Sequence, residues 1–199
     1  MEQALKRGTD LALASALMVP ALPLMLVVAA AVKLSSRGSV IFRQRRVGQN
    51  GREFTMYKFR TMHADAPLHE ERLAEENGDR VFLKIQGDIR VTRVGRLLRK
   101  FSLDELPQLL NVFNGDMSLV GPRPLLPSDM KRFPRGVWAR RFTMRPGLTG
   151  LWQVSGRSLC SDGERIRLDL DYVDQWSPTL DLQILIRTPA VVLLAKGAC

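Results

Sequence analysis

The chain is organised around one stretch of sequence, RLLRKFSLDELPQLLNVFNGDMSLVGPRP, at residues 96–124. It places two adjacent carboxylates, Asp104 and Glu105, between a cationic run and a Gly-Pro-Arg-Pro turn. A carboxylate can attack phosphorus or bind a hard divalent cation, and arginines can hold an anionic substrate beside it. This combination of residues favours phosphate chemistry.

The same residues also have a purely structural interpretation. Ser102-Leu103-Asp104-Glu105 matches the S-x-x-E capping box that begins many helices. Pro107 argues against Ser102 as the N-cap, because the proline would then break an intrahelical hydrogen bond. A helix that begins near Asp104 would keep Pro107 in its first turn and would place both carboxylates at a helix N-terminus, where bound phosphate is also favoured.

The charge of the chain indicates an anionic partner. Its 199 residues suffice for one domain, or one domain with an anchor, and carry 30 Lys and Arg against 20 Asp and Glu, a net charge of +10. Nucleic acid, acidic lipid and phosphorylated substrates all fit this charge. Cys160 and Cys199 have no metal-binding spacing, which favours a reduced, cytosolic setting.

The N-terminal segment predicts membrane attachment. Leu11 to Val32 is a run of 22 uncharged residues, long enough to cross a bilayer, but Pro20 and Pro23 would kink a helix in its middle. Cations flank both ends, whereas the positive-inside rule requires one flank poor in them. We therefore expect residues 1–36 to form a helix-break-helix that enters one leaflet and returns. A spanning helix and a cleaved signal peptide are the alternatives.

The pattern of residues 37–199 predicts a mostly helical α+β domain with interfacial amphipathic helices. Alternating apolar residues around Gln49-Asn50-Gly51 are typical of a hairpin, and Val94, Leu97 and Leu98 recur at the spacing of an amphipathic helix. Residues 64–80 are polar and acidic without regularly spaced apolar residues, which predicts a mobile helix or loop.

Two helical segments are expected near the C-terminus. An acidic helix is expected at residues 162–176, with Ile166, Leu170, Tyr172 and Val173 as its apolar residues. The apolar segment from Leu180 to Leu194, interrupted by Pro189, predicts a pair of interfacial or core-packing helices.

A second motif, RPGLTGLWQVSGR at residues 145–157, predicts part of a nucleotide site. Trp152 offers a flat apolar wall, Arg145 and Arg157 can hold phosphate, and Gly150 and Gly156 allow close approach of the backbone. Taken alone, glycine-rich turns of this kind are more often structural.

Together these motifs resemble the bacterial sugar transferase family, the monotopic phosphoglycosyl transferases, in its minimal form. The resemblance extends nearly end to end and includes Lys6-Arg7 with Asp10, RQRRVGQNGREF, YKFRTM, DIRVTRVGRLLRKFSLDELPQLLNVFNGDMSLVGPRP, RPGLTGLWQVSGR and LDLDYVDQWSPTLDLQIL. Asp171, where many members have an aromatic residue, and Leu22, where many have a small polar one, depart from the pattern.

The resemblance implies a function at the cytoplasmic face of the bacterial inner membrane. A sugar 1-phosphate would pass from a UDP-sugar donor to polyprenyl (undecaprenyl) phosphate, with release of UMP, as the first membrane step of surface glycan assembly. Asp104 would be the nucleophile, its partner Glu105 would bind Mg²⁺ (or Mn²⁺), and the re-entrant helix would break at Pro23. Membrane lipids are further expected partners, nucleic acid is not, and a homodimer is left open.

The chemistry of these residues agrees with such a reaction. Like charges about 4 Å apart repel by about 4 kcal/mol at an effective dielectric of about 20, so a diphosphate, a phosphate and Asp104 must be neutralised where they meet. Asp88 and Asp116 are candidate metal ligands beside Glu105, and Asp104 with an unperturbed pKa would be ionised at neutral pH. The candidate phosphate- and substrate-binding residues are Lys58, Arg60, Arg93, Arg99, Arg123, Arg145, Gly147, Thr149, Gln153 and Arg157.

Two other classes of function stay open at this point. A membrane-attached basic protein that binds nucleic acid or lipid would explain the net charge but not a carboxylate pair set among arginines. A structural membrane adaptor would show no turnover. Release of UMP from a UDP-sugar in the presence of polyprenyl phosphate and Mg²⁺ separates the three.

Overall fold

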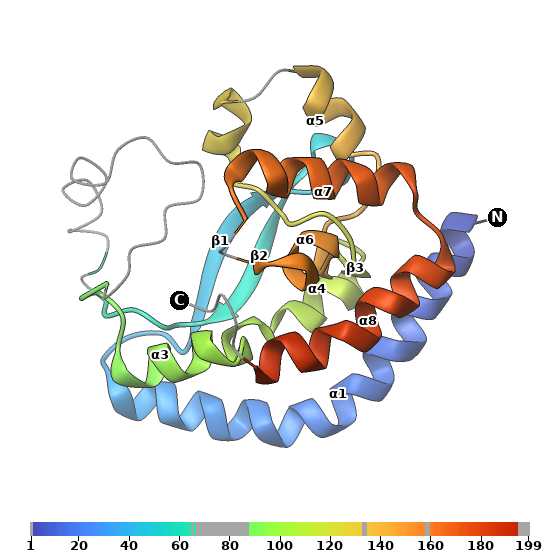
Figure 1. Cartoon of the computed structure of the whole chain (residues 1–199). Coiled ribbons are helices and arrows are strands. Elements are labelled where there is room, and N and C mark those ends of the chain that lie inside the picture. Colours follow the sequence, from blue (N-terminus) through green and yellow to red (C-terminus); the bar gives the residue numbers. More distant parts are fainter. Residues whose placement is uncertain (1, 65, 67–87, 133–134, 158–159, 195–199) are drawn as a thin grey trace.

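The computed structural model describes residues 2–64, 66, 88–132, 135–157 and 160–194. Helices surround two small two-stranded sheets, which confirms a mostly helical α+β architecture (Figure 1). Most of the polar segment 64–80, and also Cys199, lies outside the described residues.

The longest element is helix α1, Glu2–Ser35, which contains both Pro20 and Pro23. It is long and apolar enough to cross a membrane. Figure 1 shows that it bends, so that its N-terminal half runs obliquely and its C-terminal half lies along the lower edge of the molecule. The prolines therefore produce a bend within one helix rather than the non-helical break that we expected, because a proline removes one hydrogen bond and crowds the preceding turn without ending the helix.

One face of α1 packs on the rest of the protein and the other is exposed. Asp10, Ala14, Ala21, Val28 and Val32 are buried. The exposed side of the helix carries a continuous series of apolar side chains: Leu5, Leu13, Leu17, Val19, Leu22, Leu24, Leu26, Val27 and Leu34.

Strands β1, Ile41–Val47, and β2, Glu53–Phe59, form the predicted hairpin. They pair antiparallel, from Ile41 opposite Phe59 to Val47 opposite Glu53. The turn between them has left-handed backbone at Asn50 and Gly51, with φ of 56° and 75°. Asn and Gly adopt this conformation most readily, so the hairpin predicted from Asn50-Gly51 is confirmed.

The second sheet joins two motifs that are far apart in sequence. Strand β3, Ser118–Val120, pairs in parallel with β4, Gly147–Thr149. The backbones of the two segments also approach closely around these strands. A Cβ added to Gly121, Gly147 or Gly150 would overlap backbone atoms of the opposite segment. The predicted close approach at Gly150 is thus to the backbone of Gly121.

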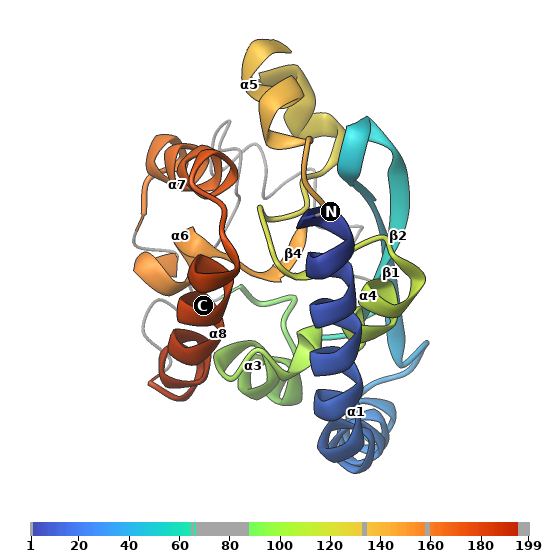
Figure 2. The same ribbon diagram turned by 90° about the vertical axis from the view of Figure 1, so that its right-hand side faces the viewer.

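The remaining helices enclose these sheets. Figure 2 shows α6, α7 and α8 on one side of the short sheet and the β1–β2 hairpin on the other. Their bounds, with those of the short 3-10 turns, are α3 Arg93–Lys100, η3 Leu103–Glu105, α4 Gln108–Asn114, η4 Pro127–Arg132, α5 Arg135–Arg141, α6 Leu151–Ser155, α7 Asp162–Asp174 and α8 Pro178–Leu193.

One expectation for these helices needs correction. The segment from Leu180 onward is one helix, α8, with Pro189 inside it, rather than a helix pair. The buried residues of α7 are Arg165, Asp169 and Tyr172, because the interior that this helix faces is partly polar. In α3, Leu98 is buried but Leu97 is 55% exposed.

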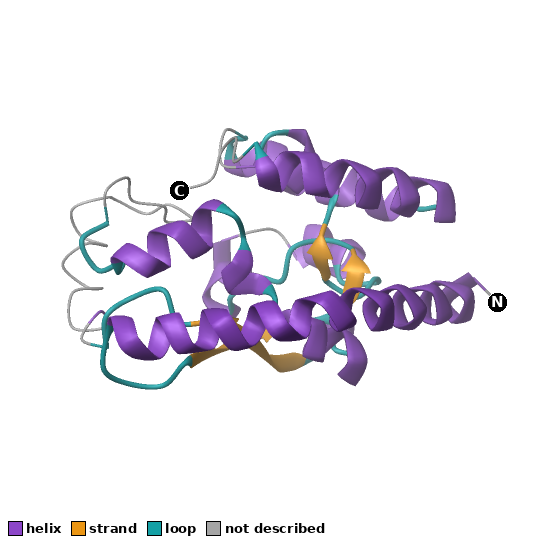
Figure 3. Ribbon diagram, turned by 90° about the horizontal axis from the view of Figure 1, so that it is seen from below, coloured by secondary structure: helices purple, strands orange, loops and turns teal. Residues whose placement is uncertain are grey.

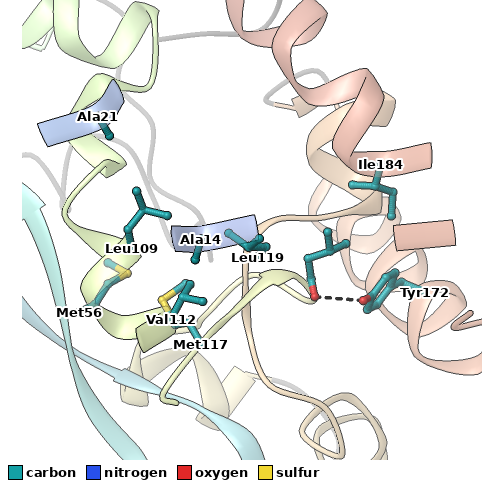
Figure 4. Close-up of a cluster of buried hydrophobic side chains, with 10 residues drawn as sticks. Ala14, Ala21, Met56, Leu109, Val112, Met117, Leu119, Tyr172 and Ile184 are labelled. Atoms are coloured by element: carbon teal, nitrogen blue, oxygen red, sulfur yellow. Dashed lines mark hydrogen bonds between the residues drawn. The ribbon is translucent and has the colours of Figure 1, made fainter. Parts of the chain in front are cut away.

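The main hydrophobic core lies between α1, α4, β3 and the C-terminal helices (Figure 4). Ala14 of α1 faces Leu109 and Val112 of α4, with Met117 and Leu119 beside them. Tyr172 and Ile184 close the core from α7 and α8, and the Tyr172 hydroxyl donates a 3.0 Å hydrogen bond to the Val120 carbonyl.

Polar contacts attach the N-terminal end of α1 to this core. Lys6 is paired with Asp181 of α8 at 2.5 Å and donates to the Val120 carbonyl. Arg7 donates to the Val112 carbonyl near the C-terminus of α4, and Asp10 accepts from the Leu119 amide of β3.

The C-terminal end of α1 is attached to the same body of the protein. Val28 and Val32 pack against Phe59 and Leu98. Arg60 donates to the carbonyls of Ser36 and Arg37, just beyond the end of the helix. Both ends of α1 are therefore held by residues of one folded unit.

The contact of α3 with the end of β2 yields a test of this packing. A Cβ on Gly95 would overlap the Thr61 carbonyl, whereas a Cβ on Gly163 in α7 meets nothing within 4 Å. We expect Gly95→Ala to lower the free energy of unfolding by about 1–3 kcal/mol, because backbone cannot yield to the added methyl group. Gly163→Ala should leave it unchanged or raise it by up to about 1 kcal/mol.

Thermal unfolding of both variants in detergent measures the difference. Equal midpoints for the two variants would show that α3 does not pack on Thr61 as described.

Candidate active site

The Asp104–Glu105 pair lies in the 3-10 turn η3, between α3 and α4. The turn is entered through Ser102, whose left-handed backbone has φ of 53° and whose hydroxyl accepts a 2.6 Å hydrogen bond from Arg157. Ser102 makes no capping hydrogen bond, so the capping-box interpretation is wrong. The two carboxylates precede α4 instead of lying in its first turn, and Pro107 stands immediately before that helix.

Glu105 is the anionic centre of a cationic site. Its Oε1 atom is 2.7 Å from Lys58 Nζ and 3.5 Å from Arg123 Nη2. Burial works to raise the pKa of Glu105, but Lys58 and Arg123 together outweigh it and hold the pKa at about 2. This carboxylate is therefore ionised throughout the physiological range.

Asp104 has a different environment. It is 8% exposed, and this burial raises its pKa, with Lys58 acting to lower it and Glu105 to raise it further. The expectation of an unperturbed pKa is wrong, because the sequence does not show how far the side chain is withdrawn from water. The pair thus combines a strongly acidic carboxyl with a more basic neighbour.

A narrow depression lies beside Glu105. The residues that line it come from both halves of the chain: Arg46, Met56, Lys58, Glu105, Gln108, Arg123, Pro124 and Gly147. The structure thus brings the predicted residues Lys58, Glu105, Arg123 and Gly147 to one place.

Sequence reasoning missed Arg46 and Gln108. Arg46 donates to the Pro124 carbonyl at 3.1 Å, and its pKa is lowered to about 10 by burial and by Arg123. Strand alternation was the signal that could have found it, because Arg46 lies on the same face of the hairpin as Met56 and Lys58. For Gln108, no pattern separated it from its neighbours in the helix.

Arg141 and Asp169 fix the turn that carries Arg123. The Arg123 carbonyl accepts from the Arg141 guanidinium, which also forms a buried ion pair with Asp169, with 2.9 Å between Nε and Oδ2. The Arg123 side chain lies 5.7 Å from the centre of the Trp152 ring. Trp152 therefore supports the cation. Since Trp152 is buried, its expected role as an apolar wall for a base stays a prediction.

The remaining candidate arginines make structural contacts or are exposed. Arg60 bonds the carbonyls that follow α1, and Arg99 Nε donates to the Thr61 hydroxyl at 2.9 Å. Arg93 is exposed at the start of α3, and Arg145 is half-buried. Their binding of phosphate stays a prediction, as does that of Arg157, which holds Ser102.

Two other candidates contact their surroundings within the protein. The Thr149 hydroxyl is 2.9 Å from that of Thr188 in α8. Gln153 donates through Nε2 to the Leu148 carbonyl at 3.0 Å. Neither hydrogen bond involves the carboxylate pair.

The predicted metal ligands are not gathered in one cluster. Asp88 is held by Arg90 at 2.7 Å, and Asp116 accepts from Asn111 at 3.2 Å. Within the described residues, no group of three or more His, Cys, Asp or Glu side chains could enclose a metal ion. Mg²⁺ is commonly held by one or two carboxylates together with substrate phosphates, so Glu105 fits an ion that binds with a diphosphate.

Comparison with known proteins agrees with this site. The bacterial sugar transferase family profile matches residues 1–195. The chain is 43% identical to the exopolysaccharide production protein ExoY of Rhizobium meliloti, over 97% of this chain and 87% of that protein. It is 43% identical to the UDP-glucose:undecaprenyl-phosphate glucose-1-phosphate transferase of Caulobacter vibrioides, over 97% of this chain and 71% of that protein.

A third relative is longer. The UDP-galactose-lipid carrier transferase of Erwinia amylovora is 41% identical over 98% of this chain, which covers 41% of that protein. A profile match over almost the whole length and identities above 40% do not arise by chance between chains of this size. The chain belongs to the bacterial sugar transferase family.

Proposed function

We propose that this protein transfers a sugar 1-phosphate from a UDP-sugar to undecaprenyl phosphate, through a covalent intermediate on Asp104. The observation that carries the proposal is the pair of adjacent carboxylates with opposite pKa shifts, set among Lys58, Arg46 and Arg123. Relatives named as UDP-glucose:undecaprenyl-phosphate glucose-1-phosphate transferase and UDP-galactose-lipid carrier transferase support the substrate class.

In the first step, an Asp104 carboxylate oxygen bonds to the phosphorus that bears the sugar, and the bond from that phosphorus to the UMP oxygen breaks. In the second, a phosphate oxygen of undecaprenyl phosphate bonds to the same phosphorus as the bond from that phosphorus to the Asp104 oxygen breaks, which frees the carboxylate. The raised pKa suits this role, because a more basic carboxylate is a stronger nucleophile when ionised.

The cations have a separate task. Lys58, Arg46 and Arg123 neutralise the phosphates that must approach two carboxylates, and Arg123 can in addition donate paired hydrogen bonds. Mg²⁺, bound through Glu105 and the diphosphate, would supply further neutralisation of charge on the leaving phosphate. The low pKa of Glu105 keeps it a carboxylate ligand at every working pH.

We infer that the protein enters the membrane from the cytoplasmic side without crossing it. The support comes from α1, whose two ends bond to the same folded unit through Lys6 and Asp10 at one end and through Arg60 at the other. A helix that crossed the bilayer would place its ends on opposite faces, about 30 Å apart, and one set of these bonds would be lost.

Neighbouring helices extend the apolar surface of α1. Figure 1 shows α3 and the C-terminal end of α8 just above the lower edge along which α1 runs, and Figure 3, seen from below, shows α1 extending across the width of the molecule. Leu97 of α3 and Ile186 of α8 are 55% and 68% exposed. Exposed cations of α3, such as Arg96 and Lys100, suit contact with anionic headgroups.

The covalent step is tested without the acceptor. We expect enzyme incubated with Mg²⁺ and a UDP-sugar labelled in the sugar to acquire label and to release about one UMP per active site. Asp104→Asn should abolish both, whereas Glu105→Gln should slow them and retain some labelling at high Mg²⁺. Mass spectrometry of the protein and measurement of UMP report the two outcomes.

A direct, one-step transfer predicts a different result. Enzyme that never acquires label or releases UMP alone, yet turns over once undecaprenyl phosphate is added, would exclude the covalent role of Asp104. A panel of UDP-sugars in the same assay identifies the sugar.

The membrane arrangement is tested by cysteine accessibility. With Cys160 and Cys199 replaced by serine, we expect neither Gln3→Cys nor Ser39→Cys to react with an impermeant thiol reagent added to intact cells, because both flanks of α1 face the cytoplasm. Both should react after permeabilisation, which is the control. Labelling of Gln3→Cys alone in intact cells would show a spanning helix.

A further inference from the structure

Gln108 is a buried amide without a hydrogen-bond partner on its nitrogen. The side chain is 2% exposed and lies in the first turn of α4, three residues after Glu105. Its Nε2 atom has no acceptor, and the residue lines the depression together with Glu105, Lys58 and Arg123. A buried N–H group left unbonded carries the full cost of its desolvation.

A second buried amide in the same helix shows what a structural role looks like. Asn111, 0% exposed, donates from Nδ2 to the Thr55 carbonyl at 2.7 Å and accepts from the Tyr57 amide at 3.1 Å. It thereby joins α4 to β2. Gln108 makes no such bridge with its nitrogen, so the packing of α4 gives no reason for a donor at this position.

The surroundings of Gln108 indicate which acceptor it would meet. Three cations, Arg46, Lys58 and Arg123, line the same site, and only Glu105 among the lining residues opposes them. Arg46 keeps its charge, since its lowered pKa is still about 10. An anion with several oxygen acceptors satisfies both the excess positive charge and the unbonded amide.

We propose that Gln108 and Arg46 form a phosphate subsite beside the carboxylate pair, in which Gln108 Nε2 donates to a phosphoryl oxygen. The identity of the ligand rests on the proposed function, which brings two phosphate compounds to this site. The phosphoryl oxygen belongs either to the nucleotide or to the polyprenyl phosphate, and the two sources are distinguished by experiment.

The test uses Gln108→Met, which removes the donor and keeps the length of the side chain. Binding of UMP, UDP and a short-chain polyprenyl phosphate to the full chain in detergent with Mg²⁺ is measured by calorimetry. We expect at least one class of phosphate to bind about tenfold more weakly, and loss confined to the nucleotides or to the lipid assigns the source. Gln108→Glu, which places an acceptor and a negative charge there, should lose more.

Thermal unfolding without ligand separates this role from a structural one. Gln108→Met should unfold at the same temperature as the parent chain or higher, because an unbonded buried amide has been removed. The matched variant Asn111→Leu should unfold at a clearly lower temperature, because it leaves the Tyr57 amide and the Thr55 carbonyl unpaired.

Three results would overturn the subsite, two of them in binding and unfolding and the third in turnover. One is unchanged affinity of Gln108→Met and Gln108→Glu for all three phosphates. Another is a lowered unfolding temperature for Gln108→Met like that of Asn111→Leu. If the wild type turns over UDP-sugars and Gln108→Met has the same kcat/KM, the subsite alone is rejected. If the wild type neither binds nor turns over any of these compounds, the proposed function is rejected as well.

Discussion

The ion pair between Lys58 and Glu105 is the interaction on which the arrangement of the site depends. It joins strand β2 of the hairpin to the turn that carries the carboxylate pair, at 2.7 Å and with both side chains largely withdrawn from water. Removing one partner of such a pair leaves an uncompensated charge, at a cost of about 3–5 kcal/mol. The ion pair also makes the pKa values of the two carboxyl groups differ. It keeps Glu105 ionised, whereas burial raises the pKa of Asp104.

A second constraint is the close crossing of the Gly-Pro-Arg-Pro turn and the segment around β4. Gly121, Gly147 and Gly150 have no room for a Cβ, so both segments require glycine for steric reasons. The crossing brings Arg123 over Trp152 and beside Glu105. The buried pair of Arg141 and Asp169 then fixes the same turn from the opposite side.

Helix α1 links this site to the apolar surface of the molecule. Lys6 and Asp10 bond to strand β3, which leads directly into the turn that carries Arg123. The same helix exposes leucine and valine side chains along its length. The exposed apolar surface of α1 and the position of the turn that carries Arg123 are therefore mechanically connected through one element, which suits the proposed transfer to a lipid acceptor.

The sequence by itself determined the local features: the hairpin at Asn50-Gly51, the amphipathic α3, the membrane-competent helix and the carboxylate pair with its family. These follow from periodicity, turn chemistry and motif, which are properties of neighbouring residues. Only the tertiary structure decided that Arg46 and Gln108 share the site with Glu105, that Ser102 is held by Arg157 instead of capping a helix, and that burial raises the pKa of Asp104. Long-range contacts and withdrawal from water depend on segments up to a hundred residues apart, and no local pattern encodes them.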